Sequence, residues 1–511
     1  MTLGHSRVSI ALLGLLALCA HLCWGATVTK QGGGLPFNLV NTEVAAWGID
    51  AVDSAVAAEV LSEVSIAGSD TEAMVVFQAR EGGSRYIKYA YFDGVQWSTE
   101  SVLNPAHRRG VDPTVAYDSL LGLFVTCVEP PGGRAEARTY DPRTGSWSTP
   151  IVVLGPSTGG LSLEFDKPTV MRGRSFAGVA EMYFFAFELN TGVRYSRAVV
   201  SGTYPLGAMS DPMALAVDTG GGSITSSFCV QPSVASTIVD SPVMVAITHP
   251  SGVWQFLRGV DQPDVGPRPG GVNFSFLEAG PSIKLELVPH QRGTISNFNP
   301  LVPGPFPMNQ RIPYILSDPT DQNRLFVVFY DAHAGSADMD VYCATLERDV
   351  LSGFWSVSDR VRVNDDIVLF GGDDADQFMC AATIDYAGRI HVIYYDDRRF
   401  TQLDSWQEPS FDVYYAYSTD SGATFGNVRL PPPPSLPADT PMLDHSLDGG
   451  GDPPRLVGDR APSDYPGIYA FGDRVWLAWV GTNPQDFSGG AAPGSPATDK
   501  TVVYVTKAQW Y

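Results

Sequence analysis

Four basic residues stand just after short apolar runs in this sequence, where strands would end and loops would begin. They are Arg80, His333, Arg398 and Arg399. Guanidinium groups that converge on one point grip a carboxylate through paired hydrogen bonds, so this set is suited to binding an anionic sugar. The alternative is that each arginine forms a salt bridge with an aspartate of a neighbouring unit.

Acidic stretches offer a second kind of chemistry. Residues 364–366, 373–376 and 444–452 each carry several carboxylate or amide oxygens. Such oxygens are the ligands that Ca²⁺ prefers, although these stretches lack the register of an EF-hand loop. No Cys/His spacing suggests zinc. The sequence therefore requires no cofactor, and Ca²⁺ is possible.

Short apolar runs supply the elements that would position these groups. Seven runs rich in β-branched and aromatic residues recur along the chain: Met74–Phe77, Leu121–Val125, Met182–Phe185, Val243–Ala246, Leu325–Phe329, Ile390–Tyr394 and Val475–Trp479. A repeat of roughly 50 residues is the size of a four-stranded propeller blade. We therefore expect an all-β propeller in which each run is the second strand of its blade. Seven blades are expected, or six if the region 166–258 is misread.

A turn phrase recurs between these runs. An acidic or small residue and a glycine lead to an aromatic residue at Trp97, Trp147, Trp254, Trp355 and Phe425. Glycine adopts the positive φ that such turns require, and an aspartate at the turn accepts hydrogen bonds from its backbone amides. We therefore expect these turns to stabilise hairpins rather than to contact a substrate.

Composition narrows the class of protein. The 511 residues include 52 Gly and 39 Pro, with 44% hydrophobic and 17% charged residues, which suits a large core built from many short strands. The formal net charge is -22, and no cluster of Lys and Arg is visible, so nucleic acid is not an expected partner. No apolar stretch after the N-terminus reaches about 18 residues, so we expect no membrane span. Cys127, Cys229, Cys343 and Cys380 are expected as buried thiols rather than as a disulfide scaffold.

The N-terminus has the pattern of a signal peptide over residues 1–25. Arg7 is followed by an apolar run over residues 8–18, and a cleavage site follows at Gly25. The apolar run is short for the alternative, a membrane anchor. We therefore expect export from the cell, or into a periplasm. Residues 26–66 are expected to form a leading segment that closes the ring, and residues 67–511 the propeller, with a Pro/Gly-rich loop or lid at about 259–310.

Two segments resemble the sialidase superfamily. Ser418–Phe425 fits the Asp-box (BNR) repeat, S-x-D-x-G-x-T-F/W, and Arg311–Pro313 fits the R-I-P motif of bacterial sialidases. The resemblance implies that Arg311 clamps a sugar carboxylate and that Asp338 is the general acid/base. His333 stands where the family usually has Arg. Tyr465, at the start of the last unit, stands where the family has its nucleophilic tyrosine.

These residues also have structural interpretations, so the activity stays open. Asp338 and Asp340 could be turn carboxylates, and Tyr465 could be a packed aromatic of the channel. Gln231 takes the place of the glutamate that the family uses to activate its tyrosine, and a free tyrosine with a pKa near 10 is a poor nucleophile. We therefore carry forward a propeller that engages an anionic carbohydrate. A sialidase-type hydrolase, a non-catalytic propeller that binds a glycan or a protein, and a polysaccharide lyase are the alternatives.

Overall fold

The computed structural model of the protein describes twenty-two segments of the chain. They are residues 35–46, 60–81, 84–99, 101–103, 110–130, 133–155, 165–176, 178–188, 192–201, 213–216, 226–230, 243–249, 253–261, 272–276, 280–284, 312–332, 339–366, 375–398, 410–440, 442–444, 465–482 and 501–511. All of the regular elements in these segments are β-strands. Within them, no helix is long and apolar enough to cross a membrane.

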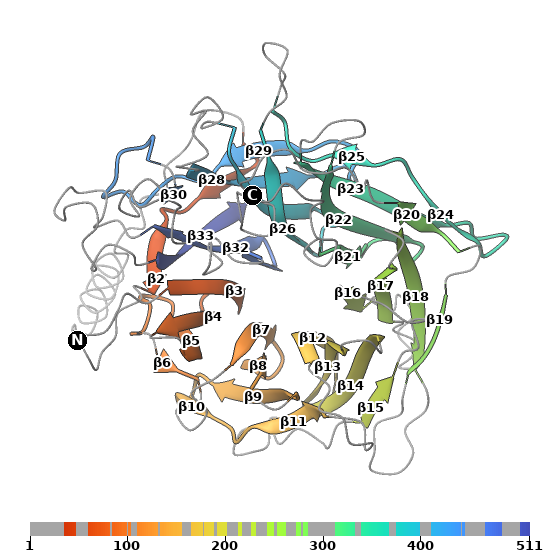
Figure 1. The fold of residues 1–511 in the computed structure, drawn as a ribbon, viewed down its shortest axis with the longest axis horizontal. Coiled ribbons are helices and arrows are strands. Elements are labelled where there is room, and N and C mark those ends of the chain that lie inside the picture. The colour runs from red at the N-terminus through yellow and green to blue at the C-terminus, as the bar shows by residue number, and fades with distance from the viewer. Residues whose placement is uncertain are drawn as a thin grey trace, which may run out of the picture.

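The described strands form seven antiparallel sheets, which stand around a common axis as the blades of a propeller (Figure 1). We number the sheets one to seven by their inner strands, which are β3 (Val60–Gly68), β7 (Val111–Asp118), β12 (Phe165–Phe176), β16 (Ser226–Val230), β21 (Tyr314–Ser317), β26 (Gln377–Ile384) and β31 (Gly467–Phe471). Each inner strand contacts the next, and β31 contacts β3, so the ring is closed. The prediction of an all-β propeller is confirmed, and seven sheets is the larger of the two blade numbers expected.

The second strand of every sheet contains one of the seven apolar runs. These strands are β4 (Ala73–Glu81), β8 (Leu123–Glu129), β13 (Val179–Glu188), β17 (Val243–His249), β22 (Arg324–Ala332), β27 (Ile390–Asp396) and β32 (Arg474–Thr482). A strand in this position has a hydrogen-bonded neighbour on both sides and a sheet packed on each face. Continuous runs such as Ile390–Tyr394 are therefore buried throughout.

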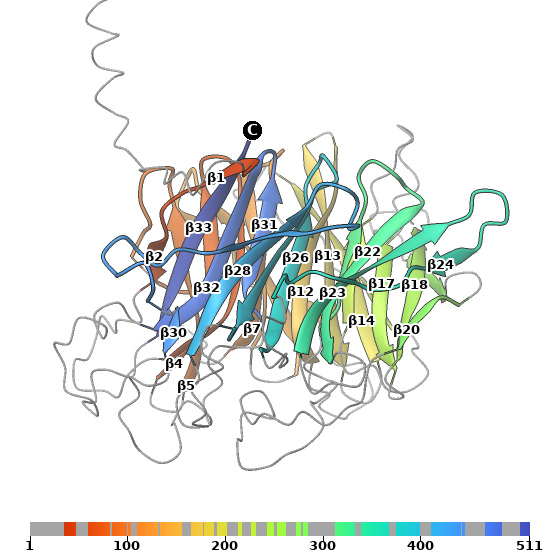
Figure 2. The ribbon, with the colours of Figure 1, turned by 90° about the horizontal axis from the view of Figure 1, so that it is seen from above.

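The third and outer strands complete each sheet. The third strands are β5 (Ser84–Phe92), β9 (Ala135–Asp141), β14 (Gly192–Ser201), β18 (Val253–Asp261), β23 (Met339–Arg348), β28 (Ser410–Ser418) and β33 (Thr501–Trp510). The outer strands are β6 (Ser101–Val102), β10 (Ser146–Trp147), β15 (Met213–Ala216), β19 (Val272–Phe276), β24 (Trp355–Val357), β29 (Gly426–Arg429) and β1 (Phe37–Leu39). Five sheets gain one more short strand: β11 (Ile151–Leu154), β20 (Ser282–Lys284), β25 (Val361–Arg362), β30 (Leu443–Asp444) and β2 (Glu43–Ala46). Figure 2 shows the sheets side by side, seen at right angles to the axis.

The N-terminal segment divides between two sheets. Both β1 and β2 pair with β33, so this part of the chain adds to the seventh sheet. Strand β3 also lies in the range expected to precede the propeller, yet it is the inner strand of the first sheet. The Thr501 hydroxyl joins these two sheets, because it accepts from the Leu61 amide at 2.6 Å and donates to the Leu61 carbonyl at 3.1 Å. The first sheet therefore begins at Val60, within the range expected to precede the propeller, while β1 and β2 complete the seventh sheet.

The range 259–310 is not a loop throughout. Strand β18 extends to Asp261, β19 pairs with its second half, and β20 pairs with its first half. These strands belong to the fourth sheet, and the rest of the range lies outside the described residues apart from 280–281. Val272–Phe276 alternates apolar and polar residues, as a strand does, but the high Pro and Gly content of the region favours the prediction of a loop.

The recurring turns are hairpins held by their own side chains. In the fullest copy, the Ser418 hydroxyl accepts from the Gly422 amide, and Asp420 accepts from the amide and the hydroxyl of Thr424. Burial alone would raise the pKa of Asp420, but the hydrogen bonds from Thr424 and Ser418 outweigh it and lower the pKa. Gly422 has a φ of +80°. The structural interpretation of this turn is confirmed.

The aromatic residues after three of the turns pack toward a neighbouring sheet. Trp97 contacts Trp476 of the seventh sheet, with ring centroids 6.4 Å apart. Trp147 contacts Tyr89 of the first sheet at 5.0 Å. Trp254 meets Phe329 of the fifth sheet edge to face at 4.7 Å. These contacts fill the wedge between blades. Among the described cysteines, Cys127, Cys343 and Cys380 are buried free thiols in the same layers.

Candidate functional site

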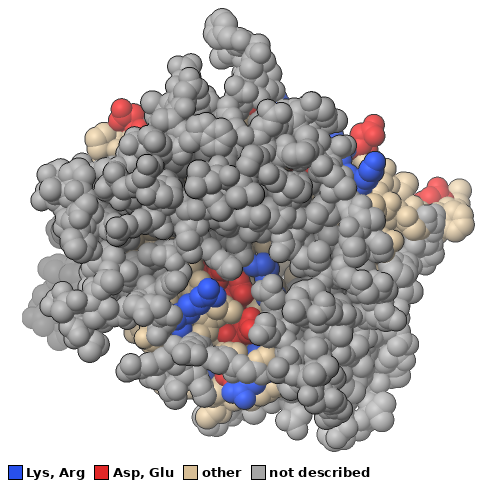
Figure 3. Space-filling view, in the orientation of Figure 1, with Lys and Arg blue, Asp and Glu red and all other residues tan. Residues whose placement is uncertain are grey.

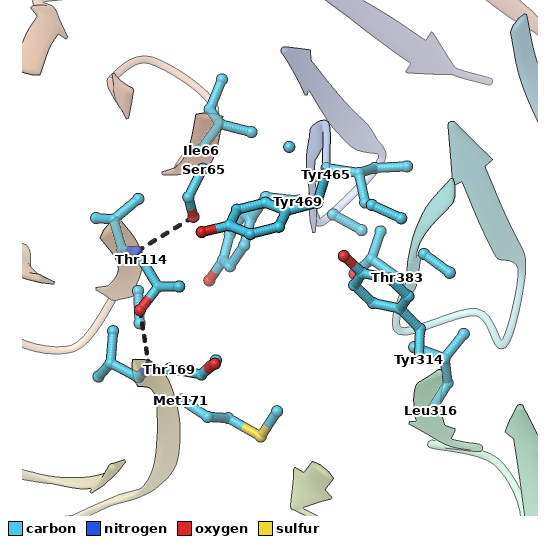
Figure 4. A pocket seen from close by; sticks show the side chains of 18 of the residues that line it. Ser65, Ile66, Thr114, Thr169, Met171, Tyr314, Leu316, Thr383, Tyr465 and Tyr469 are labelled. Atoms are coloured by element: carbon cyan, nitrogen blue, oxygen red, sulfur yellow. Dashed lines mark hydrogen bonds between the residues drawn. The ribbon is translucent and has the colours of Figure 1, made fainter. Parts of the chain in front are cut away.

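The inner strands enclose a cavity of about 430 Å³ on the axis of the ring. Six of the seven sheets contribute to its wall, from strands β3, β7, β12, β21 and β26 and from the segment that starts at Tyr465 and continues into β31. The polar and aromatic side chains of the wall include Tyr314, Tyr465, Tyr469, Ser65, Thr114, Thr169, Thr383, Lys167, Arg172 and Asp385. Figure 4 shows the Tyr465 and Tyr314 rings projecting into this space. Figure 3 shows basic and acidic side chains of described residues in the hollow at the centre of one face.

Four inner strands carry a β-bulge at the same level of the wall. The residue inside each register shift has a positive φ although it is not glycine: Glu63 at 52°, Asp112 at 49°, Lys167 at 51° and Met379 at 48°. A left-handed backbone is costly for a residue with a β-carbon, and a bulge re-aims the side chain that it carries. The recurrence in four sheets indicates that the bend sets which side chains stand at this level of the channel.

The bulged residue also opens a repeated sequence phrase. Residues 112–115 read Asp-Pro-Thr-Val and residues 167–170 read Lys-Pro-Thr-Val, while 63–66 and 465–468 keep the same spacing as Glu-Val-Ser-Ile and Tyr-Pro-Gly-Ile. Tyr465 therefore stands two residues before Gly467, as Lys167 does before Thr169. This phrase is the sequence signal that could have identified Lys167 as a channel residue.

The hydroxyl at the third position of the phrase joins neighbouring sheets. The Ser65 hydroxyl accepts a hydrogen bond from the Val115 amide at 3.2 Å. The Thr114 hydroxyl accepts from the Val170 amide at 3.0 Å and donates to the Pro168 carbonyl at 3.1 Å (Figure 4). These bonds fix the spacing of the first three inner strands, so the first position of each phrase is held in a defined place.

A chain of charged groups runs across three sheets at the level of the bulges. The Asp112 amide donates to Glu63 Oε2 at 3.2 Å, and the Asp112 carboxylate lies 3.4 Å from Lys167 Nζ. The Lys167 ammonium also lies 5.6 Å from the centre of the Tyr465 ring, which comes from the seventh sheet. The Lys167 side chain keeps 21% of its surface exposed, while Glu63 and Asp112 are buried. Lys167 is therefore the cation of this group that can meet a ligand in the cavity.

The wall also carries an ion pair and neutral phenols. Arg172 Nε lies 2.7 Å from the buried Asp118 carboxylate. The Tyr469 hydroxyl donates to the Tyr117 carbonyl at 3.3 Å. Burial raises the pKa of Tyr469 and of Tyr314 well above the usual value, so both rings keep their protons. They can donate hydrogen bonds or present an apolar face, but they are not nucleophiles at neutral pH.

The sequence-predicted residues fall into three groups. Tyr465 is buried in the wall of the cavity. Arg398 does not line it. The other candidates are Arg80, Arg311, His333, Asp338 and Arg399. The side chain of Arg80 and all of the other four lie outside the described residues. The backbone of Arg80 is in β4, opposite Val60.

Arg398 forms the salt bridges that were the alternative to ligand binding. Its guanidinium contacts Asp396 of its own sheet at 2.8 Å and Asp365 of the fifth sheet at 2.6 Å, and it lies 4.3 Å from the centre of the Tyr414 ring. Burial raises the pKa of Asp396 to about 6 although Arg398 lowers it, so the arginine favours the charged carboxylate. The arginine therefore joins two blades and is committed to that pairing.

Asp340 is not a turn carboxylate. It lies within β23 and is buried, where it accepts hydrogen bonds from Tyr342 and Asn364. No group of three or more His, Cys, Asp or Glu side chains in the described segments is arranged to hold a metal ion.

Comparisons with known proteins give distant likenesses only. No family model matches the sequence, and a search of curated proteins finds no match. Among solved structures, the intramolecular trans-sialidase from Ruminococcus gnavus is 9% identical, with 68% of this chain and 91% of that chain covered and a TM-score of 0.39. The fucose-specific lectin from Aleuria aurantia is 12% identical, with 74% and 98% covered and a TM-score of 0.36. The WD40 domain of SCAP from fission yeast is 10% identical, with 93% and 98% covered and a TM-score of 0.39. Likenesses this distant say nothing about the ligand of this chain.

Proposed function

We propose that this protein binds a carbohydrate that carries an acidic group, in the cavity on the propeller axis. The observation that supports the proposal is the composition of the wall, where tyrosine rings, side-chain hydroxyls and one lysine meet in about 430 Å³. A binding site of this kind needs apolar and aromatic surface with a few polar groups that fix orientation. Tyr465 and Tyr314 offer ring faces to the C–H faces of a sugar, and Thr383 and Thr169 offer hydrogen bonds to its hydroxyls.

Lys167 is the proposed partner of the acidic group. Its ammonium lies 5.6 Å from the centre of the Tyr465 ring, and both residues line the cavity. Lys167 is preferred to Arg398 as the anion contact, because Arg398 is held between blades by two aspartates. A carboxylate or a sulfate on the sugar would satisfy the same contact.

Binding without turnover fits the described wall better than hydrolysis does. Glycoside hydrolysis requires a carboxyl group that can exchange a proton with the glycosidic oxygen or with water. The carboxylate that lines the cavity in the described segments is Asp385, which contacts Arg389 Nε at 2.5 Å and His391 Nε2 at 3.2 Å. Burial opposes the charge of Asp385, but its bonds to His391 and Arg389 lower its pKa, so it stays ionised and is no proton donor.

A glycan array followed by calorimetry tests the proposal. The purified protein should bind acidic glycans and bind their neutral counterparts more weakly. Tyr465→Ala should weaken binding at least tenfold, while Tyr511→Ala, which removes a largely exposed tyrosine outside the cavity, should leave it unchanged. Loss of binding in both variants, or in neither, would contradict the proposal. Release of free sugar during the titration would instead indicate a hydrolase.

We further propose that the protein acts outside the cell. The leader-like pattern of residues 1–25 supports this, although these residues lie outside the described segments. N-terminal sequencing of the protein recovered from the medium or the periplasm of its host tests it. A mature chain that begins after Gly25 is the expected result.

A further inference from the structure

A buried polar cluster lies between the fifth and sixth sheets, away from the axial cavity. Asp340 comes from β23, Asn364 and Asp366 follow β25, and Gln377 begins β26. The Asn364 Nδ2 atom lies 2.6 Å from Asp340 Oδ1, 2.5 Å from Asp366 Oδ1 and 2.7 Å from Gln377 Oε1. Three oxygens from two sheets therefore surround one point at nearly equal distances.

The hydrogen bonds of this cluster do not balance. The amide of Asn364 has two hydrogens, yet three acceptors stand within 2.7 Å of its nitrogen. The amide nitrogen faces the three acceptors, while Asn364 Oδ1 accepts from the Val341 amide at 2.9 Å. In addition, Asp366 Oδ2 and Gln377 Nε2 have no hydrogen-bond partner among the described residues, although both side chains are more than nine-tenths buried. A buried carboxylate oxygen without a hydrogen-bond donor is suited to bind a cation.

The charges of the cluster do not balance either. Two carboxylates share this site, and the nearby guanidinium of Arg362 lies 3.6 Å from Asp340 Oδ1 and 4.0 Å from Asp366 Oδ1. A cation at the meeting point of the oxygens would offset the repulsion between the two buried carboxylates.

We propose that Asp340, Asp366, Gln377 and Asn364 form a calcium site that joins the fifth and sixth blades. The oxygens now lie 2.5–2.7 Å from the Asn364 nitrogen, close to the Ca²⁺–oxygen distances of about 2.3–2.6 Å. The ion takes the place of that nitrogen, and the Asn364 side chain turns so that its oxygen becomes a ligand. The Asp366 carboxylate can then bind through both of its oxygens, which gives Oδ2 a partner.

Calcium fits this set better than the other biological cations. The ligands are two carboxylates and two carboxamide oxygens, which are hard donors, and none is His or Cys. Mg²⁺ demands a near-octahedral shell at about 2.0–2.1 Å, which would require four side chains from two sheets to contract around it.

Calcium titration of the full chain tests the site. Relative to protein in chelator, Ca²⁺ at 100 times its Kd should raise the Tm by roughly 3 °C for a chain of this size, and Mg²⁺ should do much less. Tb³⁺ should bind in place of Ca²⁺ with sensitised emission, since the Tyr342 hydroxyl lies 2.9 Å from Asp340 Oδ2. Added Ca²⁺ should displace the Tb³⁺.

Matched variants separate this site from other acidic surfaces. Asp366→Asn should abolish the calcium-dependent rise in Tm and weaken Tb³⁺ binding at least tenfold. Asp365→Asn changes the neighbouring carboxylate, which contacts Arg398 and is half exposed, and should keep the calcium response. A wild-type protein whose Tm does not respond to Ca²⁺ would overturn the proposal, whatever the variants do. Equal responses of Asp366→Asn and the wild type would overturn it as well.

Discussion

Replacing Lys167 by methionine isolates the electrostatic part of ligand binding. The change removes the ammonium that lies in the axial cavity and keeps an unbranched side chain of similar length. A hydrogen bond to a charged group contributes about 1.5–3 kcal/mol, which corresponds to a loss of affinity of roughly 10- to 150-fold. We therefore expect the Kd for an acidic glycan to rise by that factor, while the Kd for a neutral sugar of the same size changes less than threefold.

The same change has a calculable effect on folding. The ammonium lies 3.4 Å from the buried carboxylate of Asp112, which would lose that partner. Weakening a charged pair of this kind costs about 1–3 kcal/mol. Because the entropy of unfolding is about 2 cal/mol/K per residue, a chain of this length would lose about 1–3 °C in Tm. The variant should therefore remain folded at 25 °C, and its binding can be measured directly.

Calorimetry with two control variants tests whether Lys167 contacts the acidic group of the glycan. Lys167→Arg keeps the charge and should keep most of the affinity. Lys507→Met removes a lysine that lies outside the cavity, 4.8 Å from the centre of the Trp476 ring, and should leave binding unchanged. If Lys167→Met binds the acidic glycan as tightly as the wild type, the assignment of the anion contact is wrong. An equal loss for the neutral sugar would show that the variant damages the cavity rather than a charge contact.

Three further predictions concern the scaffold. Asp420→Asn should lower the Tm at pH 7, because folding lowers the pKa of the Asp420 carboxyl and the charged form stabilises the turn. That stabilisation is lost as the carboxyl is protonated, so the difference in Tm from the wild type should shrink between pH 4 and pH 2. Arg398→Met should lower the Tm by roughly 3–5 °C without changing glycan affinity, since it removes the partner of the buried Asp396 carboxylate. The loss in Tm should be smaller at pH 5 than at pH 8, because the pKa of Asp396 is raised to about 6 and the carboxyl is largely protonated at pH 5. Thr501→Val should lower the Tm by about 1–3 °C, since the buried Leu61 amide loses its 2.6 Å partner between the first and last sheets. Thermal unfolding followed by circular dichroism measures all three.

The fold could be predicted because its signals are local. A run such as Val475–Trp479 is apolar at every position, and a strand that is buried on both faces requires that pattern. The turn at Ser418–Phe425 is equally local, since its hydrogen bonds join residues at most four positions apart. Both features therefore follow from short stretches of sequence without knowledge of the neighbouring blades.

The direction of Arg398 could not be predicted in this way. Its place after β27 sets the end of the sheet at which it lies, but not whether it points to the axis or to the next blade. That choice depends on Asp365, which is 33 residues earlier and belongs to another sheet, and on the ring of Tyr414. A salt bridge between blades depends on residues that are distant in the sequence, so the residues around Arg398 do not predict it.

The inner strands were difficult to predict for a different reason. Four of the seven are interrupted by a bulge, and hydroxyl and charged residues interrupt their apolar series. Lys167 sits in a left-handed conformation that its side chain disfavours, so neither periodicity nor propensity identifies it. Only the comparison of Asp112–Val115 with Lys167–Val170 shows that the two positions are equivalent.

The first and third positions of this four-residue phrase have different roles. At the third position, Ser65 and Thr114 hold the next inner strand through hydrogen bonds, so a change there disturbs the ring. The first position varies from the carboxylates Glu63 and Asp112 to Lys167 and the aromatic Tyr465. If Lys167 and Tyr465 select the ligand, their substitution should alter which glycan binds while lowering the Tm by no more than about 3 °C. Substitution of Thr114 by valine should do the opposite, because it removes the contacts to Val170 and Pro168 while leaving the chemistry of the first positions intact.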